Sequence, residues 1–157
     1  MSMERARAHL EKFGFQDRIQ EFTESSATVE LAAQRLGVEP ARIAKTLSFK
    51  VEDHAILIVA AGDVKIDNPK YKAAFHTKAK MLAHEEVEEL TGHMVGGVCP
   101  FGVKEGVEVY LDESLKRFTT VFPAVGTAAS AIELTIPELK RVSCFRQWVD
   151  VCKPLAQ

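Results

Sequence analysis

The chain has 157 residues, with 20 Lys and Arg against 22 Asp and Glu and a formal net charge of -2 at pH 7. This length fits one folded domain, 1–157, which can bury roughly two-thirds of the surface of its unfolded chain. The charge balance excludes a protein that grips a long stretch of nucleic-acid backbone, because such binding needs an excess of Lys and Arg. Binding of only the terminal nucleotide of an RNA needs no such excess.

Membrane and secretion signals are missing from the sequence. No apolar run approaches the roughly 20 residues of a membrane helix, and residues 1–11 are charged and lack the apolar centre of a signal peptide. The cysteines Cys99, Cys144 and Cys152 form an odd set without a C-x-x-C pair. We expect reduced thiols, and therefore a cytoplasmic protein that does not associate with membranes.

Apolar periodicity and the placement of Gly and Pro predict the following elements in chain order. We expect a helix at 3–13 that ends at Gly14, a short strand at 15–22, a helix at 29–36 and a short helical segment that begins at Pro40. Further along we expect strands at 46–51 and 55–61, helices at 68–75 and 84–90, a strand at 107–111, a helical turn at 114–118, strands at 119–123 and 131–134, a helical turn at 137–140 and a strand at 148–151.

Several of the predicted helix ends carry residues that commonly cap helices. Ser26 or Thr28 can cap the helix at 29–36, and Gly37 can adopt the left-handed conformation at its end. Asp67 can cap the helix at 68–75 in the same way.

The strongest strand signal lies within residues 46–61. Two apolar runs are separated there by Glu52-Asp53-His54, a spacing typical of a hairpin. The second run is apolar throughout, which indicates a strand that is buried on both faces. Hairpins combined with intervening helices, without strict alternation of strand and helix, predict an α+β fold with a mixed, mostly antiparallel sheet.

Lys45 opens an otherwise apolar run, just before the strand predicted at 46–51. The stem of a lysine can lie along apolar neighbours while its ammonium reaches a cleft. There it can neutralise a phosphate or polarise a carbonyl. A solvated surface lysine is the alternative that the residues alone leave open.

The segment Gly96 to Gly102 holds three glycines and a proline, Pro100, in seven residues. Gly96 and Gly97 let a ligand approach the backbone closely, and their amides can form an anion nest or an oxyanion hole. A tight connection between strands explains the same composition.

Two other turns and the histidines complete the candidates. Gly62-Asp63 follows the most apolar strand, and Gly126-Thr127 follows the strand at 119–123. The five histidines include no pair at metal-binding spacing, so we expect no metal site. Cys99 with His93 as its base is a conceivable nucleophile, but a buried or loop thiol is the preferred interpretation.

Lys45-Thr46-Leu47, Gly62-Asp63, the Gly-Gly-x-x-Pro-x-Gly loop and Gly126 resemble, in order and spacing, the YbaK/ProX-like aminoacyl-tRNA deacylases. The resemblance extends from about residue 28 to 151. It implies a β-barrel-like mixed sheet surrounded by helices, and hydrolysis of the ester that joins a wrong amino acid to tRNA.

The resemblance also implies roles for individual residues. The residue that matches the family's essential lysine is Lys45, which is expected to be catalytic. Expected to bind substrate are Thr46, Gly62, Asp63, Gly96, Gly97, Pro100 and Gly126. The attacking water is expected to be activated by a free ribose hydroxyl of the substrate, without a side-chain base, metal or cofactor.

The sequence departs from the Cys-tRNA(Pro) deacylase branch at two positions. A serine and an aspartate near the pocket of that branch are replaced here by Ala124 and Ala131. This departure argues against a cysteinyl substrate and leaves alanine, serine, threonine or another small residue.

Together these observations predict a trans-editing hydrolase that acts on the acceptor end of misacylated tRNA, most often proline tRNA. Prolyl-tRNA synthetase is a further expected partner, and the protein is expected to be a monomer or a homodimer. Two alternatives remain open: a tRNA- or synthetase-binding module that has lost the chemistry, and a hydrolase or sensor of small amino-acid esters.

Overall fold

A computed structural model describes residues 2–25 and 28–155. Five α-helices are present in the described residues: α1 (Ser2–Glu11), α2 (Val29–Leu36), α3 (Asn68–Phe75), α4 (His84–Thr91) and α5 (Ile136–Ser143). Short 3-10 helices are η1 (Gln16–Arg18), η2 (Pro40–Arg42) and η3 (Glu113–Arg117). The strands are β1 (Ile19–Glu21), β2 (Ile43–Val51), β3 (His54–Ala61), β4 (Val64–Ile66), β5 (Glu108–Asp112), β6 (Thr120–Pro123), β7 (Ser130–Ile132), β8 (Leu134–Thr135), β9 (Gln147–Val149) and β10 (Cys152–Pro154).

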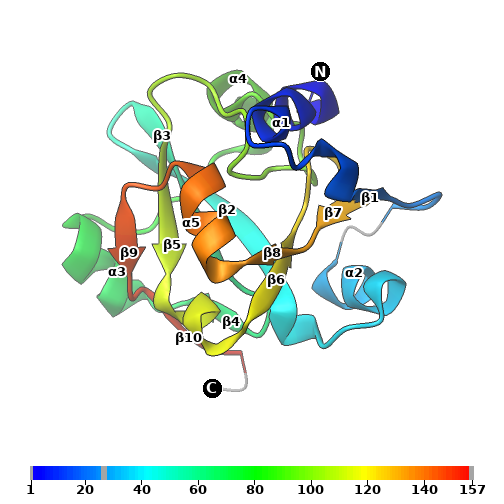
Figure 1. Ribbon diagram of the computed structural model, residues 1–157. Coiled ribbons are helices and arrows are strands. Elements are labelled where there is room, and N and C mark those ends of the chain that lie inside the picture. The colour runs from blue at the N-terminus through cyan, green and yellow to red at the C-terminus, as the bar shows by residue number, and fades with distance from the viewer. Residues whose placement is uncertain (1, 26–27, 156–157) are drawn as a thin grey trace.

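The central feature is a six-stranded mixed sheet in the order β8-β6-β2-β3-β5-β9. Strands β2 and β3 form a long antiparallel hairpin, β6 and β8 are antiparallel, and the other three neighbouring pairs are parallel. Two smaller antiparallel ribbons, β1–β7 and β4–β10, flank this sheet. The strands curl into a half-barrel with helices on its outside (Figure 1), so the predicted α+β fold with a barrel-like mixed sheet is confirmed. Antiparallel pairing does not predominate in this sheet as expected, because three of its five strand pairs are parallel.

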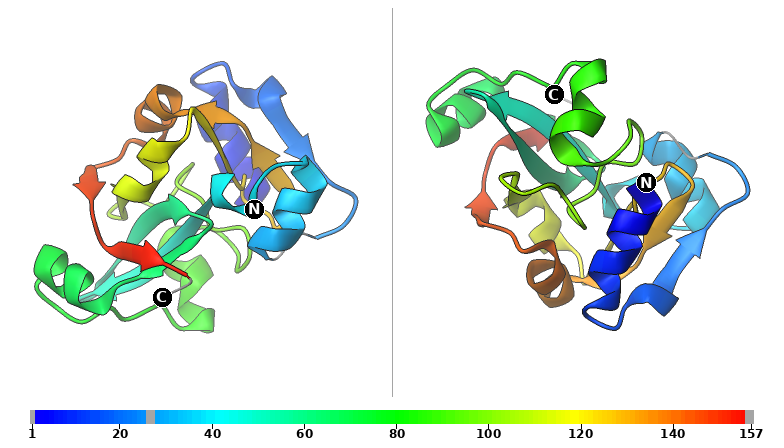
Figure 2. Two further views of the ribbon diagram at one scale, coloured as in Figure 1. Left: turned by 90° about the horizontal axis from the view of Figure 1, so that it is seen from below. Right: turned by 90° about the horizontal axis from the view of Figure 1, so that it is seen from above.

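The helices cover different sides of the sheet. The view from above has α1 and α4 on the near side, and the view from below has β10 on the near side (Figure 2). Strand β3 is the centre of the core, because its residues Leu57 to Ala61 are all fully buried. This burial on both faces agrees with its uninterrupted apolar sequence. No helix in the described residues is long and apolar enough to span a membrane.

The predicted caps are present where the structure describes them. Thr28 accepts a hydrogen bond from the amide of Leu31 at 3.1 Å, and Gly37 closes α2 in the left-handed conformation. Asp67 accepts from the amide of Lys70 at 3.2 Å at the start of α3. Ser26, the other candidate cap for α2, lies outside the described residues. Local sequence therefore sets these helix ends.

Several predicted strand boundaries were wrong. Strand β2 begins at Ile43, and Lys45 lies within it rather than before it, because Ile43 and Ala44 pair with β6. The strand predicted at 131–134 is two strands, β7 and β8, which pair with different partners. The segment 15–22 begins as η1 before becoming β1, and β4 and β10 were not expected at all. Apart from η1, which is a local 3-10 turn, each difference arises from pairing with a distant segment, which local periodicity does not report.

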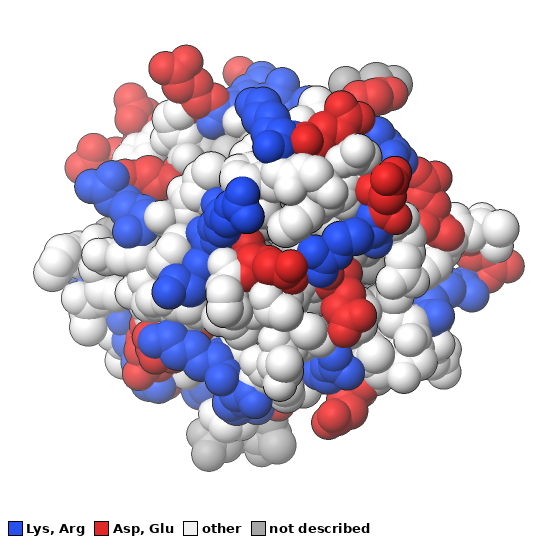
Figure 3. All heavy atoms as spheres, in the orientation of Figure 1, with Lys and Arg blue, Asp and Glu red and all other residues white. Residues whose placement is uncertain are grey.

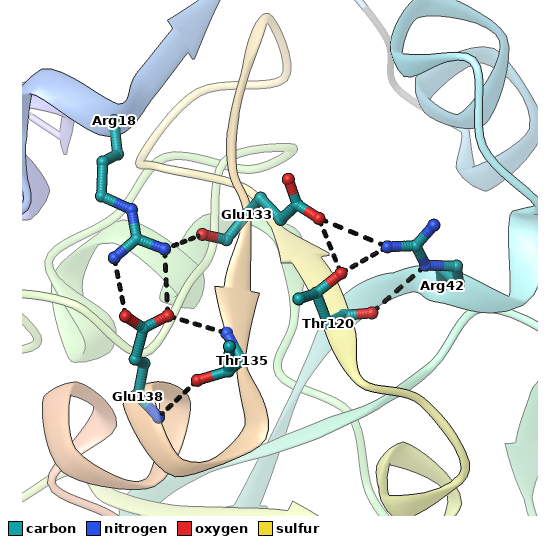
Figure 4. Close-up of polar contacts among 6 residues, drawn as sticks. All are labelled: Arg18, Arg42, Thr120, Glu133, Thr135 and Glu138. Carbon is teal, nitrogen blue, oxygen red and sulfur yellow. Dashed lines mark hydrogen bonds and ion pairs between the residues drawn. The ribbon is translucent and has the colours of Figure 1, made fainter.

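A polar network ties the edge of the sheet to the elements around it (Figure 4). The guanidinium of Arg18 donates to both carboxylate oxygens of Glu138 at 2.9 Å and to the carbonyl of Glu133 at 2.7 Å. Glu138 also completes a capping box with Thr135 at the start of α5. Hydrogen bonds from Arg18 and Thr135 lower the pKa of Glu138 to about 2.

Positive and negative side chains alternate over much of the face seen in Figure 3. This mixture agrees with a formal net charge of -2. Electrostatic recognition of a partner must therefore depend on local groups of charges rather than on the charge of the whole protein.

Candidate functional site

A cavity of about 450 Å³ lies beside β2. Its wall is formed by all residues of β2 from Ile43 to Ser48, by α2, by the start of α4 and by the loops around Gly96 and Thr127. Most of the lining side chains are apolar, and none of the described lining residues carries a carboxylate. A cavity of this size falls in the range of small-molecule sites and suits a small neutral group better than a cation.

Lys45 is the one Lys or Arg among the described lining residues of this cavity. It is half-buried, and its ammonium donates a hydrogen bond to the carbonyl of Val64. Burial lowers the pKa of Lys45, while the nearby Asp63 and Glu30 oppose this change. An ammonium has three donors, so two remain for a ligand when one is held by Val64.

The turn between β3 and β4 holds the carbonyl that Lys45 contacts. Gly62 packs so closely on η2 that a Cβ atom there would lie 2.1 Å from the carbonyl oxygen of Pro40. Asp63 receives two hydrogen bonds from the guanidinium of Arg117, at 3.0 and 2.6 Å, and these lower the pKa of its carboxyl. Neither Gly62 nor Asp63 is among the lining residues; both brace the turn that carries Val64.

The two glycines expected to donate amides differ in the structure. Gly96 lines the cavity with a φ of +90°, and no acceptor among the described residues takes its amide hydrogen. The amide of Gly97 instead donates to the carbonyl of Met94 at 3.0 Å. Gly97 is therefore not available as an oxyanion donor, because its amide is already used within the loop.

Gly97 and Gly126 allow two loops of the cavity wall to pack backbone against backbone. A Cβ atom on Gly97 would lie 2.2 Å from the carbonyl oxygen of Gly126, and one on Gly126 would lie 2.4 Å from that of Ser2. Gly96 and Ala128, which both line the cavity, are brought into contact in this way. A Cβ atom on Gly96 would lie 3.6 Å from the Cβ of Ala128.

Pro100 is buried at the base of the same loop, beside a polar cluster around His93. The Nε2 atom of His93 donates to the carbonyl of Phe101 at 2.6 Å, so its Nδ1 atom accepts from the hydroxyl of Ser2 at 2.9 Å. Cys99 lies 3.5 Å from Nε2, but burial raises the pKa of its thiol to about 12. The structure thus places Cys99 and His93 in a buried hydrogen-bonded cluster. Because the thiol stays protonated, the two residues do not form a nucleophile with its base.

The two alanines that depart from the deacylase branch both line the cavity. Ala124 and Ala131 leave that side without a polar side-chain group, and the neighbouring hydroxyl of Ser130 is occupied by the amide of Val125 at 3.0 Å and the carbonyl of Thr127 at 3.1 Å. Thr46 is different, because its buried hydroxyl has no hydrogen-bond partner in the described residues. A buried polar atom of this kind is unfavourable unless a ligand satisfies it.

Several lining residues were not anticipated from the sequence. Ser48 follows Thr46 by two positions and could have been inferred from the alternation of a strand. Met81, His84 and Phe122 reach the cavity only through tertiary packing, and no local pattern identifies them. Among the described residues, no group of three or more His, Cys, Asp or Glu side chains is arranged to hold a metal ion.

Comparison with known proteins identifies the group to which this arrangement belongs. Residues 23–142 match the family model of the aminoacyl-tRNA editing domain. The chain belongs to this family. The match covers α2, the described lining residues of the cavity and five of the six strands of the central sheet, all but β9, and it agrees with the YbaK/ProX-like resemblance of the sequence motifs.

Relatives of the editing-domain family extend over nearly the whole chain. The protein YwhH of Bacillus subtilis (strain 168) is 56% identical over 154 residues, which are 98% of each chain. EbsC of Enterococcus faecalis, named as a candidate Cys-tRNA(Pro)/Cys-tRNA(Cys) deacylase, is 30% identical over 115 residues, 72% of this chain and 70% of EbsC. A solved structure described as a candidate trans-editing enzyme for prolyl-tRNA synthetase superposes with a TM-score of 0.87 at 32% identity, with 97% of both chains covered.

A segment of a synthetase is also similar to this editing domain. The proline–tRNA ligase of Bacillus velezensis is 32% identical over 95 residues, which are 60% of this chain and 17% of the ligase.

Proposed function

We propose that this protein hydrolyses the ester bond of misacylated tRNA in trans, and that its substrate is proline tRNA carrying a small non-cognate amino acid. The proposal rests chiefly on one observation: Lys45 lines the same apolar cavity as Gly96, whose amide has no acceptor among the described residues, in a member of the editing-domain family. The names of EbsC and of the superposed trans-editing structure support the same activity and the same tRNA.

The proposed reaction needs little from the protein beyond positioning. A water oxygen bonds to the ester carbonyl carbon, the bond from that carbon to the ribose oxygen breaks, and the ribose oxygen takes up the proton. The neighbouring free ribose hydroxyl orients the water and relays its proton. Since an aminoacyl ester is already reactive, alignment and stabilisation of the oxyanion supply the acceleration.

The side chains divide this work as follows. Val64 anchors the ammonium of Lys45, whose two remaining donors hold the terminal phosphate or the ester carbonyl. The amide of Gly96 donates to the developing oxyanion, a task that Gly97 cannot share. In this proposal the ribose hydroxyl takes the place of a protein base: the described lining residues hold no carboxylate, and His84 is their one histidine.

The amino acid is selected by the size and polarity of the cavity. Ala124 and Ala131 contribute only methyl groups to its wall, and no acidic side chain among the described lining residues could hold a cationic side chain. An apolar pocket admits its cognate side chain and smaller ones and excludes larger ones by volume. Volume does not separate cysteine from serine or threonine, so the inferred preference for alanine, serine or threonine over cysteine rests on the replacement of the serine and aspartate of the Cys-tRNA(Pro) deacylase branch by Ala124 and Ala131.

A deacylation panel tests this function. Proline tRNA charged with alanine, serine, threonine, cysteine or proline is incubated with the wild type, with Lys45→Met and with Lys140→Met as a surface control. We expect the wild type and the control to remove a small amino acid and Lys45→Met to lose this activity while remaining folded. Full activity in folded Lys45→Met protein would refute the proposed mechanism.

His84 provides a test of the proposed absence of a protein base. It is exposed at the start of α4 and is the one histidine among the described lining residues. His84→Gln is expected to keep the turnover number of the wild type. A loss of more than about 100-fold, the contribution typical of a general base, would assign the base to His84 instead.

The binding-module alternative predicts a different outcome of the same panel. The missing polar groups at Ala124 and Ala131 are the observation in its favour. Tight binding of aminoacyl-tRNA without hydrolysis of any ester in the panel would establish the module and exclude the hydrolase.

A further inference from the structure

Two lysines face each other across the ribbon formed by β4 and β10. Lys65 and Lys153 are Cα partners in this antiparallel pair. Directly opposed residues in an antiparallel pair project their side chains to the same face, and like charges in this position destabilise the ribbon. Val64 and Cys152 are buried and occupy the other face, so the two lysines share the opposite face, where both are half-buried.

Neither lysine has a counter-ion among the described residues, although neighbouring cations do. Arg117 is paired with Asp63 at 2.6 Å, and Lys70 with Asp150 at 3.1 Å. No carboxylate of the described residues lies within 4.0 Å of the amine of Lys65 or Lys153. The ribbon thus keeps two like charges together and leaves both unneutralised.

This lysine pair adjoins the candidate cavity through the backbone. Val64, whose carbonyl holds the ammonium of Lys45, directly precedes Lys65 and is the Cα partner of Pro154, the neighbour of Lys153. Strands β4 and β10 lie side by side at the lower end of the molecule in Figure 1. The lysine pair therefore begins one residue along β4 from the carbonyl that holds the ammonium of Lys45.

We propose that Lys65 and Lys153 form a docking site for the phosphates of the single-stranded 3′ end of the substrate RNA. This inference rests on the proposed function and extends it from the ester to the nucleotides that precede it. The pair supplies the local positive charge that the balanced surface otherwise lacks, and phosphate oxygens remove the repulsion between the two amines.

If the lysine pair only holds the RNA, its removal should weaken substrate binding without slowing hydrolysis of the ester. The double variant Lys65→Gln/Lys153→Gln is expected to raise the KM for Ala-tRNA(Pro), to leave kcat unchanged and to leave the hydrolysis of 3′-alanyl-adenosine unchanged. The matched control is Lys12→Gln/Lys140→Gln, which removes the same charge from two exposed lysines outside the ribbon. Lys65→Arg/Lys153→Arg keeps the charge and is expected to restore the KM.

Salt dependence gives a second readout that does not require turnover. Each phosphate contact with a single strand adds roughly 0.7 to the slope of log affinity against log salt. Binding of a short RNA that ends in CCA should therefore lose a slope of about 1.4 in the Gln double variant. Between 50 and 200 mM salt, the wild-type affinity should fall about sevenfold more than that of the variant.

The outcomes separate this proposal from the function on which it rests. If the wild type hydrolyses no aminoacyl-tRNA but its RNA binding depends on the lysine pair, the docking site stands and the hydrolase does not. If the Gln double variant has the same KM and the same salt slope as the Lys12/Lys140 control, the docking site is refuted. Loss of prolyl-tRNA synthetase binding with unchanged RNA binding would also refute it.

Discussion

Replacement of Gly97 by alanine should damage the cavity wall more than the same change at Gly96. The added Cβ at position 97 would lie 2.2 Å from the carbonyl oxygen of Gly126 and 2.6 Å from the amide nitrogen of Thr127. Ordinary contact begins near 3.4 Å, so the first of these distances is 1.2 Å too short. Both opposing atoms belong to the backbone and cannot rotate away.

The loop that carries Gly126 has little room to yield. Its own glycine is pressed against the backbone of Ser2, where a Cβ on Gly126 would lie 2.4 Å from the carbonyl oxygen. Overpacking of this kind costs about 1–3 kcal/mol, and the smaller entropy of the unfolded alanine variant returns about 0.4–1 kcal/mol. A contact of 2.2 Å with backbone atoms places the cost at the upper end of this range, so after the entropy return we expect Gly97→Ala to lower the free energy of unfolding by about 2 kcal/mol.

Gly96→Ala is the matched comparison, because the free-energy cost of this substitution comes from backbone conformation and not from a steric clash. Its φ is +90°, but a Cβ there would be an ordinary 3.6 Å from the Cβ of Ala128. A left-handed alanine costs about 1–2 kcal/mol, and the entropy gain of the unfolded chain offsets about half of this.

Urea unfolding of both variants measures the difference between their free energies of unfolding, and thermal unfolding gives the corresponding change in Tm. For a protein of this length, 2 kcal/mol corresponds to a fall in Tm of about 4–8 °C. A Gly97→Ala protein as stable as Gly96→Ala, or as the wild type, would show that the two loops do not meet as described and would remove this account of the cavity wall.

Three further outcomes are expected. Thr46→Val removes a buried hydroxyl without a partner in the described residues and should raise the free energy of unfolding by about 1 kcal/mol. A lower Tm than that of the wild type would mean that the hydroxyl has a hydrogen-bond partner within the protein. The pKa of Glu138 is lowered to about 2 by Arg18 and Thr135, so its stabilisation is complete above pH 4.5 and is lost as the pH falls toward 2. Glu138→Gln should therefore flatten the acid side of the stability profile, and an unchanged profile would contradict the pairing. Arg117→Met should cost less than about 1 kcal/mol, since the pair with Asp63 is largely exposed; a double-mutant cycle with Asp63→Asn that gives a coupling of several kcal/mol would contradict this estimate.

Helices and the main hairpin could be predicted because their signals are local. Thr28 and Asp67 cap the helices that follow them, and Gly37 and Gly92 close α2 and α4 in left-handed conformations. Each contact joins residues within a few positions, so neighbouring sequence is sufficient to specify it.

The small ribbons could not be predicted in the same way. Strands β4 and β10 have three residues each and are separated by more than eighty positions. Segments this short carry no periodicity, and each becomes a strand only because the other supplies its hydrogen bonds. The pairing of Lys65 with Lys153 on this ribbon could not be predicted from the sequence for the same reason.

The residues of the candidate site could likewise be identified from sequence motifs, but their contacts depend on the tertiary structure. Lys45 and the glycine loop were predicted on motif and resemblance, and Lys45 and Gly96 line the cavity, whereas Gly97 and Pro100 are not among its lining residues. Gly97, Asp63 and Gly62 were assigned to substrate, whereas in the structure they pack or pair with other parts of the protein. A glycine that allows a ligand to approach and one that allows a second loop to approach have the same sequence signature.

The amino-acid sequence alone determined the helix ends, the buried hairpin and the presence of a lysine and a glycine loop typical of editing domains, because these depend on residue type and short-range spacing. Only the tertiary structure decided which amide of the loop is unpaired, where the ammonium of Lys45 is anchored and which cations lack a counter-ion. These properties depend on which backbone and charged groups meet across the fold, and burial and pairing between distant segments set them.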